Sequence, residues 1–269
     1  MKLRKALTSA VVGCGMLHAA SASALLFDQN VTPEVIFGSG NTNGSFTVDR
    51  ANGVELGLRG KLRHNAAGAP ENTFNSNSDG TYSFNAGVAP TQAAPTAEWS
   101  FEWSINSDYD DTSGYFLSSL NYVLGLDSDP TAGTSFVTFD PINGGGCGGG
   151  AAVSWDHAIG NNSTGNGGGT KFGGAPVCDT ASYATAIGAN NVAQNSWKPH
   201  WFLASSGFDP TVDGTYDFYL QANDSAGAQV ARTSMQIIVG DGAAQVPVPA
   251  TLLLFGAGLL GLGYSRRKA

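Results

Sequence analysis

The sequence predicts an all-β fold: a two-sheet antiparallel β-sandwich of jelly-roll or immunoglobulin-like type, with an N-terminal signal peptide and a single apolar C-terminal helix. Two observations predict the sandwich. Between the two ends of the chain, apolar and polar residues alternate with period two in about eight to ten short runs, and no stretch shows a sustained helical period. Gly, Asn, Asp and Pro separate these runs, as in sheets joined by short turns.

The N-terminal residues 1–24 have the order of a secretory signal. A cationic start precedes an uncharged apolar stretch that ends in the small-residue triplet Ala22-Ser23-Ala24, which predicts cleavage after Ala24. An alternative remains, because the sequence up to Cys14 resembles a lipobox, whose Cys would be acylated after cleavage. Both interpretations predict an exported protein.

The first predicted hairpin spans residues 46–62. Asn52-Gly53 favours a two-residue turn between its strands. One face of this hairpin is apolar and the other is charged; the second strand contributes Val54, Leu56, Leu58 and Leu62 to the first face, and Glu55, Arg59, Lys61 and Arg63 to the second. The next aromatic run repeats the pattern, with Trp99, Phe101, Trp103 and Ile105 inward and Glu98, Ser100 and Glu102 outward. Such an outward face is typical of a solvated strand.

The remaining runs complete the predicted sandwich. They are Tyr82/Phe84, 120–126, 136–139, 216–222 and 235–239. We predict one folded ectodomain. The full division is signal peptide 1–24, β-sandwich 25–240, linker and proline motif 241–249, transmembrane helix 250–264 and cytoplasmic basic tail 265–269.

The charge of the body, which is the part of the chain between the signal peptide and the C-terminal tail, argues against anionic partners. Between the signal and the tail, seven Lys and Arg residues stand against 21 Asp and Glu residues, a net charge of −14. Nucleic acid and anionic lipid would be repelled by such a body, which should be soluble. Divalent cations are its natural counter-ions.

Two cysteines remain once Cys14 leaves with the signal. In an oxidising compartment Cys147 then pairs with Cys178. The disulfide would close a loop rich in Gly, with a chain-entropy stabilisation of about 3–4 kcal/mol. Neither a CxxC motif nor a four-ligand zinc set is present in the sequence.

The densest acidic patch is a candidate calcium site. Asp108, Asp110 and Asp111 alternate with other oxygen-bearing residues, and two more carboxylates could complete the site, namely Asp127 and Asp129. An EF-hand is excluded, because its loop requires Gly at the sixth position and Glu at the twelfth, and this sequence has other residues at both. The alternative is a polar turn whose Asp side chains cap their own backbone.

Aromatic residues suggest a possible glycan contact. Trp197 and Trp201 could be half-exposed and stack on sugar rings, although aromatic residues of sandwiches usually belong to the core. We expect no enzymatic activity. Glu98 and Glu102 would lie about 13 Å apart on a strand, whereas paired catalytic carboxyls lie about 5–9.5 Å apart.

The C-terminus combines a proline motif, an apolar stretch and a basic end. The motif is Val246-Pro247-Val248-Pro249-Ala250, and the basic end is Arg266, Arg267 and Lys268. The uncharged residues 250–264 would reach about 22 Å as a helix, somewhat less than a bilayer core. The cations should stay cytoplasmic, which places the body outside.

These C-terminal residues resemble the PEP-CTERM sorting signal, with a departure at Val248, where that family most often has Glu. The resemblance implies export, a transient inner-membrane intermediate, processing by an exosortase, and a final place at the cell surface or in the extracellular matrix. The alternative is a permanent single-pass anchor. Pieces of the body, among them "EWSFEWSIN" and "GTYDFYLQAND", also resemble a recurrent PEP-CTERM ectodomain.

The resemblance and the body together support three hypotheses about function. The first is a structural or adhesive component associated with extracellular polysaccharide and the biofilm matrix. The second is a calcium-assisted carbohydrate-binding module, for which calcium would be the cofactor. The third is a cryptic glycan-active enzyme.

Overall fold

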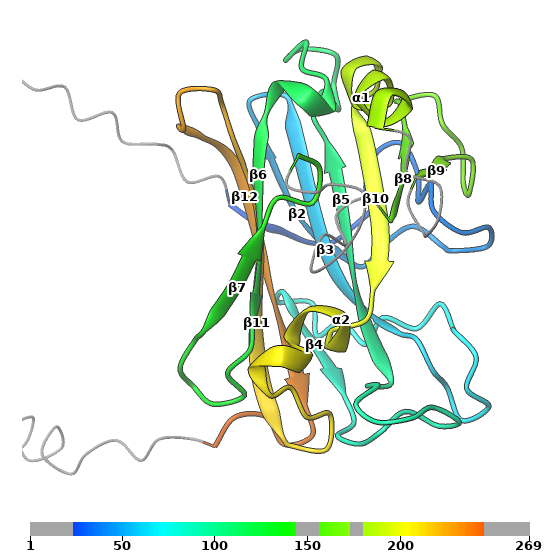
Figure 1. Ribbon diagram of the computed structural model, residues 1–269, viewed down its shortest axis with the longest axis vertical. Coiled ribbons are helices and arrows are strands. Elements are labelled where there is room, and N and C mark those ends of the chain that lie inside the picture. The colour runs from blue at the N-terminus through cyan, green and yellow to red at the C-terminus, as the bar shows by residue number, and fades with distance from the viewer. Residues whose placement is uncertain (1–23, 144–155, 173–179, 245–269) are drawn as a thin grey trace, which may run out of the picture.

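The computed structural model describes residues 24–143, 156–172 and 180–244, which form two β-sheets packed face to face (Figure 1). The seven-stranded sheet contains, in order, β1 (Leu26–Gln29), β2 (Phe46–Ala51), β3 (Val54–Leu62), β5 (Trp99–Asn106), β10 (Val192–Trp197), β8 (His157–Gly160) and β9 (Thr170–Phe172). The five-stranded sheet contains, in order, β4 (Thr81–Phe84), β12 (Gln229–Val239), β11 (Gly214–Asn223), β6 (Asn121–Asp127) and β7 (Phe136–Phe139). The prediction of a mainly β, two-sheet fold is confirmed.

Neighbouring strands are antiparallel except β4 and β12, which pair in parallel. The helical elements are few: α1 (Thr180–Ala189), α2 (His200–Leu203), and the 3-10 turns η1 (Leu117–Ser119) and η3 (Ala204–Ser206). Figure 1 shows α1 and α2 near opposite ends of β10, which separates them in the sequence. The helix α1 was not among the predicted elements. Its small Ala, Gly, Ser and Thr residues leave only Tyr183 and Ile187 buried, too few to show a helical period.

The core between the sheets is aromatic and is centred on β5. Trp99, Phe101, Trp103 and Ile105 are all fully buried, as the alternating pattern predicted. Phe101 meets Phe218 of β11 edge to face, with ring centroids 5.1 Å apart. Edge-to-face contacts of this kind add about 0.5–1.5 kcal/mol to the burial of apolar area. The predicted turn also forms, because Asn52 (φ 53°) and Gly53 (φ 77°) both adopt the left-handed conformation that a type I′ turn requires.

The outer face of the seven-stranded sheet is not solvated, and that prediction is wrong. Glu55, Arg59, Lys61, Ser100 and Glu102 are at most 2% exposed. The segment from residue 30 to residue 45 folds back over this face, where its side chains Val31, Val35, Ile36 and Phe37 form a second apolar cluster with Phe46, Val48, Ala158 and Val192. The period-two pattern assigned the right residues of β3 and β5 to this face. In β2 the apolar residues Phe46 and Val48 lie on the outer face, whereas Thr47 and Asp49 lie opposite Leu58 and Leu56 on the inner one, so the single apolar face predicted for the hairpin is wrong in its first strand. The pattern could not show what covers the outer face.

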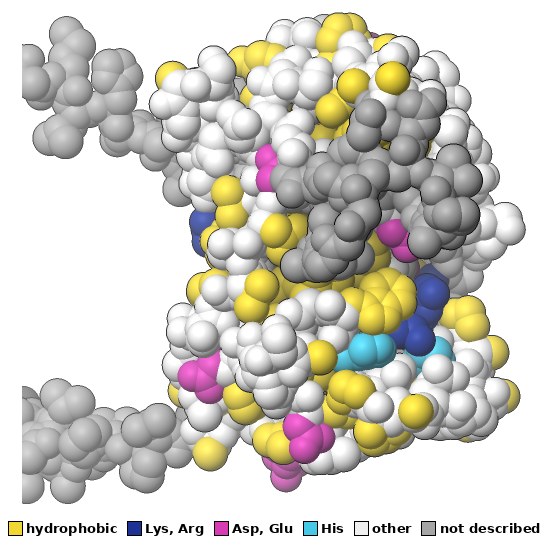
Figure 2. All heavy atoms as spheres, viewed as in Figure 1, with side chains coloured by type: hydrophobic (Ala, Val, Ile, Leu, Met, Phe, Trp, Pro, Cys, Tyr) yellow, Lys and Arg dark blue, Asp and Glu magenta, His cyan; other side chains and the backbone are white. Residues whose placement is uncertain are grey.

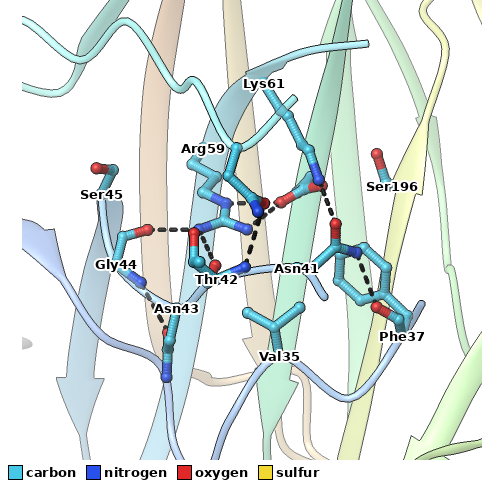
Figure 3. Close-up of polar contacts among 12 residues, drawn as sticks. Val35, Phe37, Asn41, Thr42, Asn43, Gly44, Ser45, Arg59, Lys61 and Ser196 are labelled. Atoms are coloured by element: carbon cyan, nitrogen blue, oxygen red, sulfur yellow. Dashed lines mark hydrogen bonds and ion pairs between the residues drawn. The ribbon is translucent and has the colours of Figure 1, made fainter. Parts of the chain in front are cut away.

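A buried ionic cluster ties this covering segment to the sheet (Figure 3). Arg59 of β3 lies opposite Glu102 of β5, and its Nε donates to Glu102 Oε2 at 2.6 Å. Lys61 Nζ lies 3.5 Å from Glu102 Oε1 and also donates to the side chain of Asn41. Arg59 Nη1 donates to the carbonyl oxygens of Thr42 (3.0 Å) and Gly44 (2.6 Å). One carboxylate therefore serves two buried cations, and the covering segment supplies further hydrogen-bond acceptors to both of them.

Replacing this carboxylate should destabilise the protein strongly. Glu102→Gln leaves Arg59 and Lys61 buried without a counter-charge, so we expect a loss of about 3–5 kcal/mol in the free energy of unfolding. Urea unfolding followed by tryptophan fluorescence measures it. The matched control is Lys171→Gln, which breaks the ion pair of an exposed Lys with Asp156 and should change stability by at most about 1 kcal/mol. An equal loss in the free energy of unfolding for the two substitutions would contradict the conclusion that Glu102 stabilises the fold more than an exposed ion pair does.

Candidate functional site

Trp197 is a core residue, and its predicted contact with glycan is wrong. The side chain is fully buried, with its Nε1 donating to the carbonyl oxygen of Asp156 at 3.1 Å. Its ring lies 5.0 Å from that of Trp103. The alternation along β10 turns Trp197 inward, toward the same side of the sheet as Phe101, its cross-strand neighbour.

Trp201, the other predicted contact, lies at the surface. It belongs to α2, is 43% exposed, and lines a cavity of about 270 Å³. The polar residues of this cavity include Asn41, Arg63, Asp156, Lys171 and Ser196. Near the position that α2 has in Figure 1, Figure 2 shows His side chains beside Lys or Arg side chains and hydrophobic side chains. The structure thus brings an exposed indole together with groups that can bind hydroxyls and anions.

Histidine and lysine side chains surround Trp201. Lys198 Nζ lies 5.9 Å from the centre of the Trp201 ring, and the ring of His200 lies 6.1 Å from it. Burial lowers the pKa of His200, and Lys198 and His64 lower it further. Burial likewise lowers the pKa of His64, against the opposing effect of its contact with the carbonyl of Gly68. Both imidazoles are therefore neutral at pH 7, and each can donate one hydrogen bond.

The acidic turn at residues 106–114 is closed by its own hydrogen bonds. Asp108 Oδ1 accepts from the backbone N–H of Ser113 at 2.9 Å, and Asp110 Oδ1 accepts from that of Thr112 at 3.2 Å. Asp111 accepts from Asn162 Nδ2 at 3.1 Å. This is the geometry of Asp side chains that cap their own turn.

A second cavity, of about 350 Å³, lies beside this turn. Its lining residues include Asp108, Asp111, Phe116, Asn162 and Asn191. Phe116 is 49% exposed. Carboxylate, amide and aromatic groups together can bind sugar hydroxyls and stack on a sugar ring.

Asp127 and Asp129 do not join the turn at residues 106–114, which corrects that part of the predicted calcium set. That turn leads through η1 to the start of β6, whereas Asp127 ends β6, about 20 Å farther along the strand. Asp127 is buried and accepts from the backbone N–H of Ser135 (2.7 Å) and of Asp129 (3.0 Å). Within the described ranges, no group of three or more His, Cys, Asp or Glu side chains is placed to hold a metal ion.

Several predicted residues lie outside the described residues. These are Cys147 and Cys178, the proline motif Val246-Pro247-Val248-Pro249-Ala250, and the basic residues Arg266, Arg267 and Lys268. In the part of the chain that the structure describes, no helix has both the length and the apolar character needed to cross a membrane.

The sequence did not predict that Arg63 lines the Trp201 cavity or that Lys198 lies over the Trp201 ring. Arg63 was assigned only to a polar strand face, and Lys198 was not singled out. The stretch "WKPHWF" could have indicated the site, since it concentrates aromatic and basic residues in an otherwise acidic chain. Nothing in the local sequence places Arg63 beside it.

Comparison with known proteins identifies the C-terminal segment. The profile of the PEP-CTERM protein-sorting motif matches residues 245–268. The comparisons with curated proteins and with solved structures gave no match. The match confirms the resemblance read from the proline motif, the apolar stretch and the basic end.

Asp127 should prove to be a structural residue. In Asp127→Ala the backbone N–H groups of Ser135 and Asp129 lose their acceptor, so we expect a loss of about 1–3 kcal/mol in the free energy of unfolding. The loss should be the same with calcium and with a chelator. Asp129→Ala, at a less buried position, is the control and should have a smaller effect. A loss that appears only when calcium is present would restore the calcium interpretation.

The histidines should make stability depend on pH. His64 and His200 have lowered pKa values in the folded protein, so below the unfolded value of about 6.5 the unfolded chain binds more protons. Stability should therefore fall as the pH drops from about 7.5 to about 5. The double variant His64→Gln/His200→Gln should show a flatter dependence in that window, measured by urea unfolding. A parallel fall in the variant would exclude these two groups as the cause.

Proposed function

We propose that this chain, a PEP-CTERM domain-containing protein, serves at the cell surface or in the extracellular matrix as a non-enzymatic structural or adhesive component associated with extracellular polysaccharide. The matched motif indicates an exported protein that an exosortase sorts. Its association with the polysaccharide is our proposal. The single observation that carries it is the sorting motif at residues 245–268, which follows directly on the two-sheet body.

The order of the chain supports this proposal. The last described strand, β12, ends at Val239, and the motif match begins at residue 245. Only a few residues therefore separate the body from the sorting segment. We propose that the body folds beyond the inner membrane while the tail holds it there, and that processing then releases it toward the polysaccharide.

The two carboxylates considered for catalysis support a non-enzymatic role. Glu102 is fully buried and ion-paired with Arg59 and Lys61. Glu98 Oε1 accepts from the backbone N–H of Asn85 at 2.8 Å. A glycosidase pair needs both carboxyls free to face one scissile bond, and Glu102 faces the covering segment instead.

A second candidate function is a calcium-assisted carbohydrate-binding module. The observation that favours it is the cavity of about 350 Å³, where Asp108, Asp111, Asn162 and Asn191 surround an exposed Phe116. Glycan binding that requires calcium and is lost in Asp111→Ala and Phe116→Ala would favour this candidate over a general matrix role.

The C-terminal sorting motif should determine the final location of the protein. In cells that carry an exosortase, we expect the mature protein to end near residue 250 and to co-fractionate with the polysaccharide. Pro247→Ala/Pro249→Ala should leave Ala269 in place and keep the protein in the membrane fraction, because the extended approach to the cleavage site is lost. Mass spectrometry of the C-terminal peptide measures both.

Two controls make this experiment decisive. Gln245→Ala, at the edge of the motif, should be processed like the parent. Enzymatic digestion of the polysaccharide should release the mature protein from the matrix fraction. An intact Ala269 on the parent in washed membranes would indicate a permanent anchor, and retention after digestion would exclude association with the polymer.

A further inference from the structure

We propose that an acidic saccharide binds at the Trp201 cavity, with the sugar ring stacked on Trp201 and its carboxylate held between Arg63, which lines the cavity, and Lys198, which does not line it but lies 5.9 Å from the centre of the Trp201 ring. The inference deepens the proposed polysaccharide association, on which it rests for the class of polymer. It specifies the part of the fold that binds the saccharide and predicts that the bound saccharide is negatively charged. The argument starts from the cations of the body.

Most cations of the body have partners. Arg50 pairs with Glu55 at 2.7 Å, Lys171 pairs with Asp156 at 3.2 Å, and Glu102 serves both Arg59 and Lys61. Arg63 and Lys198 differ, because neither side chain makes an ion pair or a hydrogen bond with any described residue. In a body with three times as many acids as cations, two such cations at the same end of one sheet need an explanation.

The sheet brings these two cations together. Arg63 directly follows β3 and Lys198 directly follows β10, the two strands that flank β5. Along both strands the residues of the same parity, Lys61 and Ser196, face outward. The strand register therefore places both cations on the outer side of the sheet, beyond the edge of the covering segment.

The directions of the pKa shifts agree with the placement given by the strand register. Burial lowers the pKa of Lys198, and Arg63 lowers it further. Burial also lowers the pKa of Lys61; Glu102 opposes this effect, while Arg59 and Arg63 add to it. Two like charges that repel each other at one site favour an anion between them, since an anion relieves the repulsion and is offered charge-assisted hydrogen bonds.

The remaining features of the cavity fit a sugar. Trp201 is 43% exposed and can offer a ring face, and Lys198 already lies over that ring at 5.9 Å. The Asp156–Lys171 pair supplies an acceptor and a donor for hydroxyl groups on the lining of the same cavity. A volume of about 270 Å³ lies just below the usual range of about 300–1,000 Å³ for ligand pockets. It therefore suits one ring unit of a polymer rather than a long segment.

The test compares one sugar in two charge states. The full chain, purified in detergent micelles, is titrated calorimetrically with oligomers of galacturonic acid and with matched oligomers of galactose, which carry a hydroxymethyl group in place of the carboxylate. We expect the acidic oligomer to bind at least about tenfold more tightly, as expected for one charge-assisted contact. Trp201→Ala should weaken binding of the acidic oligomer, and Arg63→Gln/Lys198→Gln should remove the preference for it.

The controls keep charge and aromatic content matched. Arg232→Gln removes an exposed cation from β12, where the guanidinium lies 4.0 Å over the Tyr219 ring, and Phe27→Ala removes an exposed aromatic side chain of β1, which lines neither cavity. Both should bind like the parent. Thermal unfolding of each variant verifies that it is folded. Absence of binding by the parent, equal affinity for the two oligomers, or an equal loss in Arg232→Gln would each overturn the inference.

Failure of this inference is distinguishable from failure of the proposed function. The titration requires neither export nor processing, and the tail variants leave Arg63, Lys198 and Trp201 unchanged. A parent protein that is sorted and released by polymer digestion, yet binds no acidic oligomer, would overturn only the site. A parent protein that binds the oligomer but keeps Ala269 in the membrane would overturn only the sorting step.

Discussion

One buried carboxylate organises the outer half of this fold. Glu102 lies at the centre of the seven-stranded sheet, and both Arg59 and Lys61 depend on it for a counter-charge. Burial of three charged groups is costly unless each is paired and hydrogen-bonded. The carbonyl oxygens of Thr42 and Gly44 accept hydrogen bonds from Arg59 Nη1, and these bonds form only when the covering segment is in place. The seven-stranded sheet and the covering segment are therefore expected to unfold together as one cooperative unit.

This constraint also positions the candidate site. Phe37 and Asn41 belong to the covering segment, and they line the Trp201 cavity together with residues of the sheet. Asn41 accepts from Lys61 and donates to the carbonyl of Phe37, so it connects the ionic cluster to the cavity wall. Where the cover ends, the outward positions of β3 and β10 continue as Arg63 and Lys198. The outer face of the sheet therefore carries charged side chains in two places. Around Glu102 the covering segment buries them, whereas beside Trp201 they lie at a cavity.

The sequence was sufficient for features that depend on local pattern. It placed the Asn52-Gly53 turn and the inward face of β5, because turn chemistry and period-two alternation are local signals. It could not show that residues 30–45 cover the outer face, since these residues carry no alternation and the contact is non-local. Likewise, Trp201 could be proposed from its own surroundings, whereas its neighbour Arg63 comes from a distant strand. Adjacency of β3, β5 and β10 brings them together, and no local signal encodes the order of strands in a sheet.

The charge distribution of the whole chain now has a physical interpretation. A body of net charge −14 should repel most polyanions. At physiological ionic strength, however, the field of distant carboxylates is screened beyond a Debye length of about 8 Å, so a ligand that reaches the cavity responds mainly to its nearest charges. Arg63 and Lys198 dominate there because Glu102 and Asp156 are already committed to other cations. An acidic protein can in this way repel most polyanions and still hold one acidic group at a defined place.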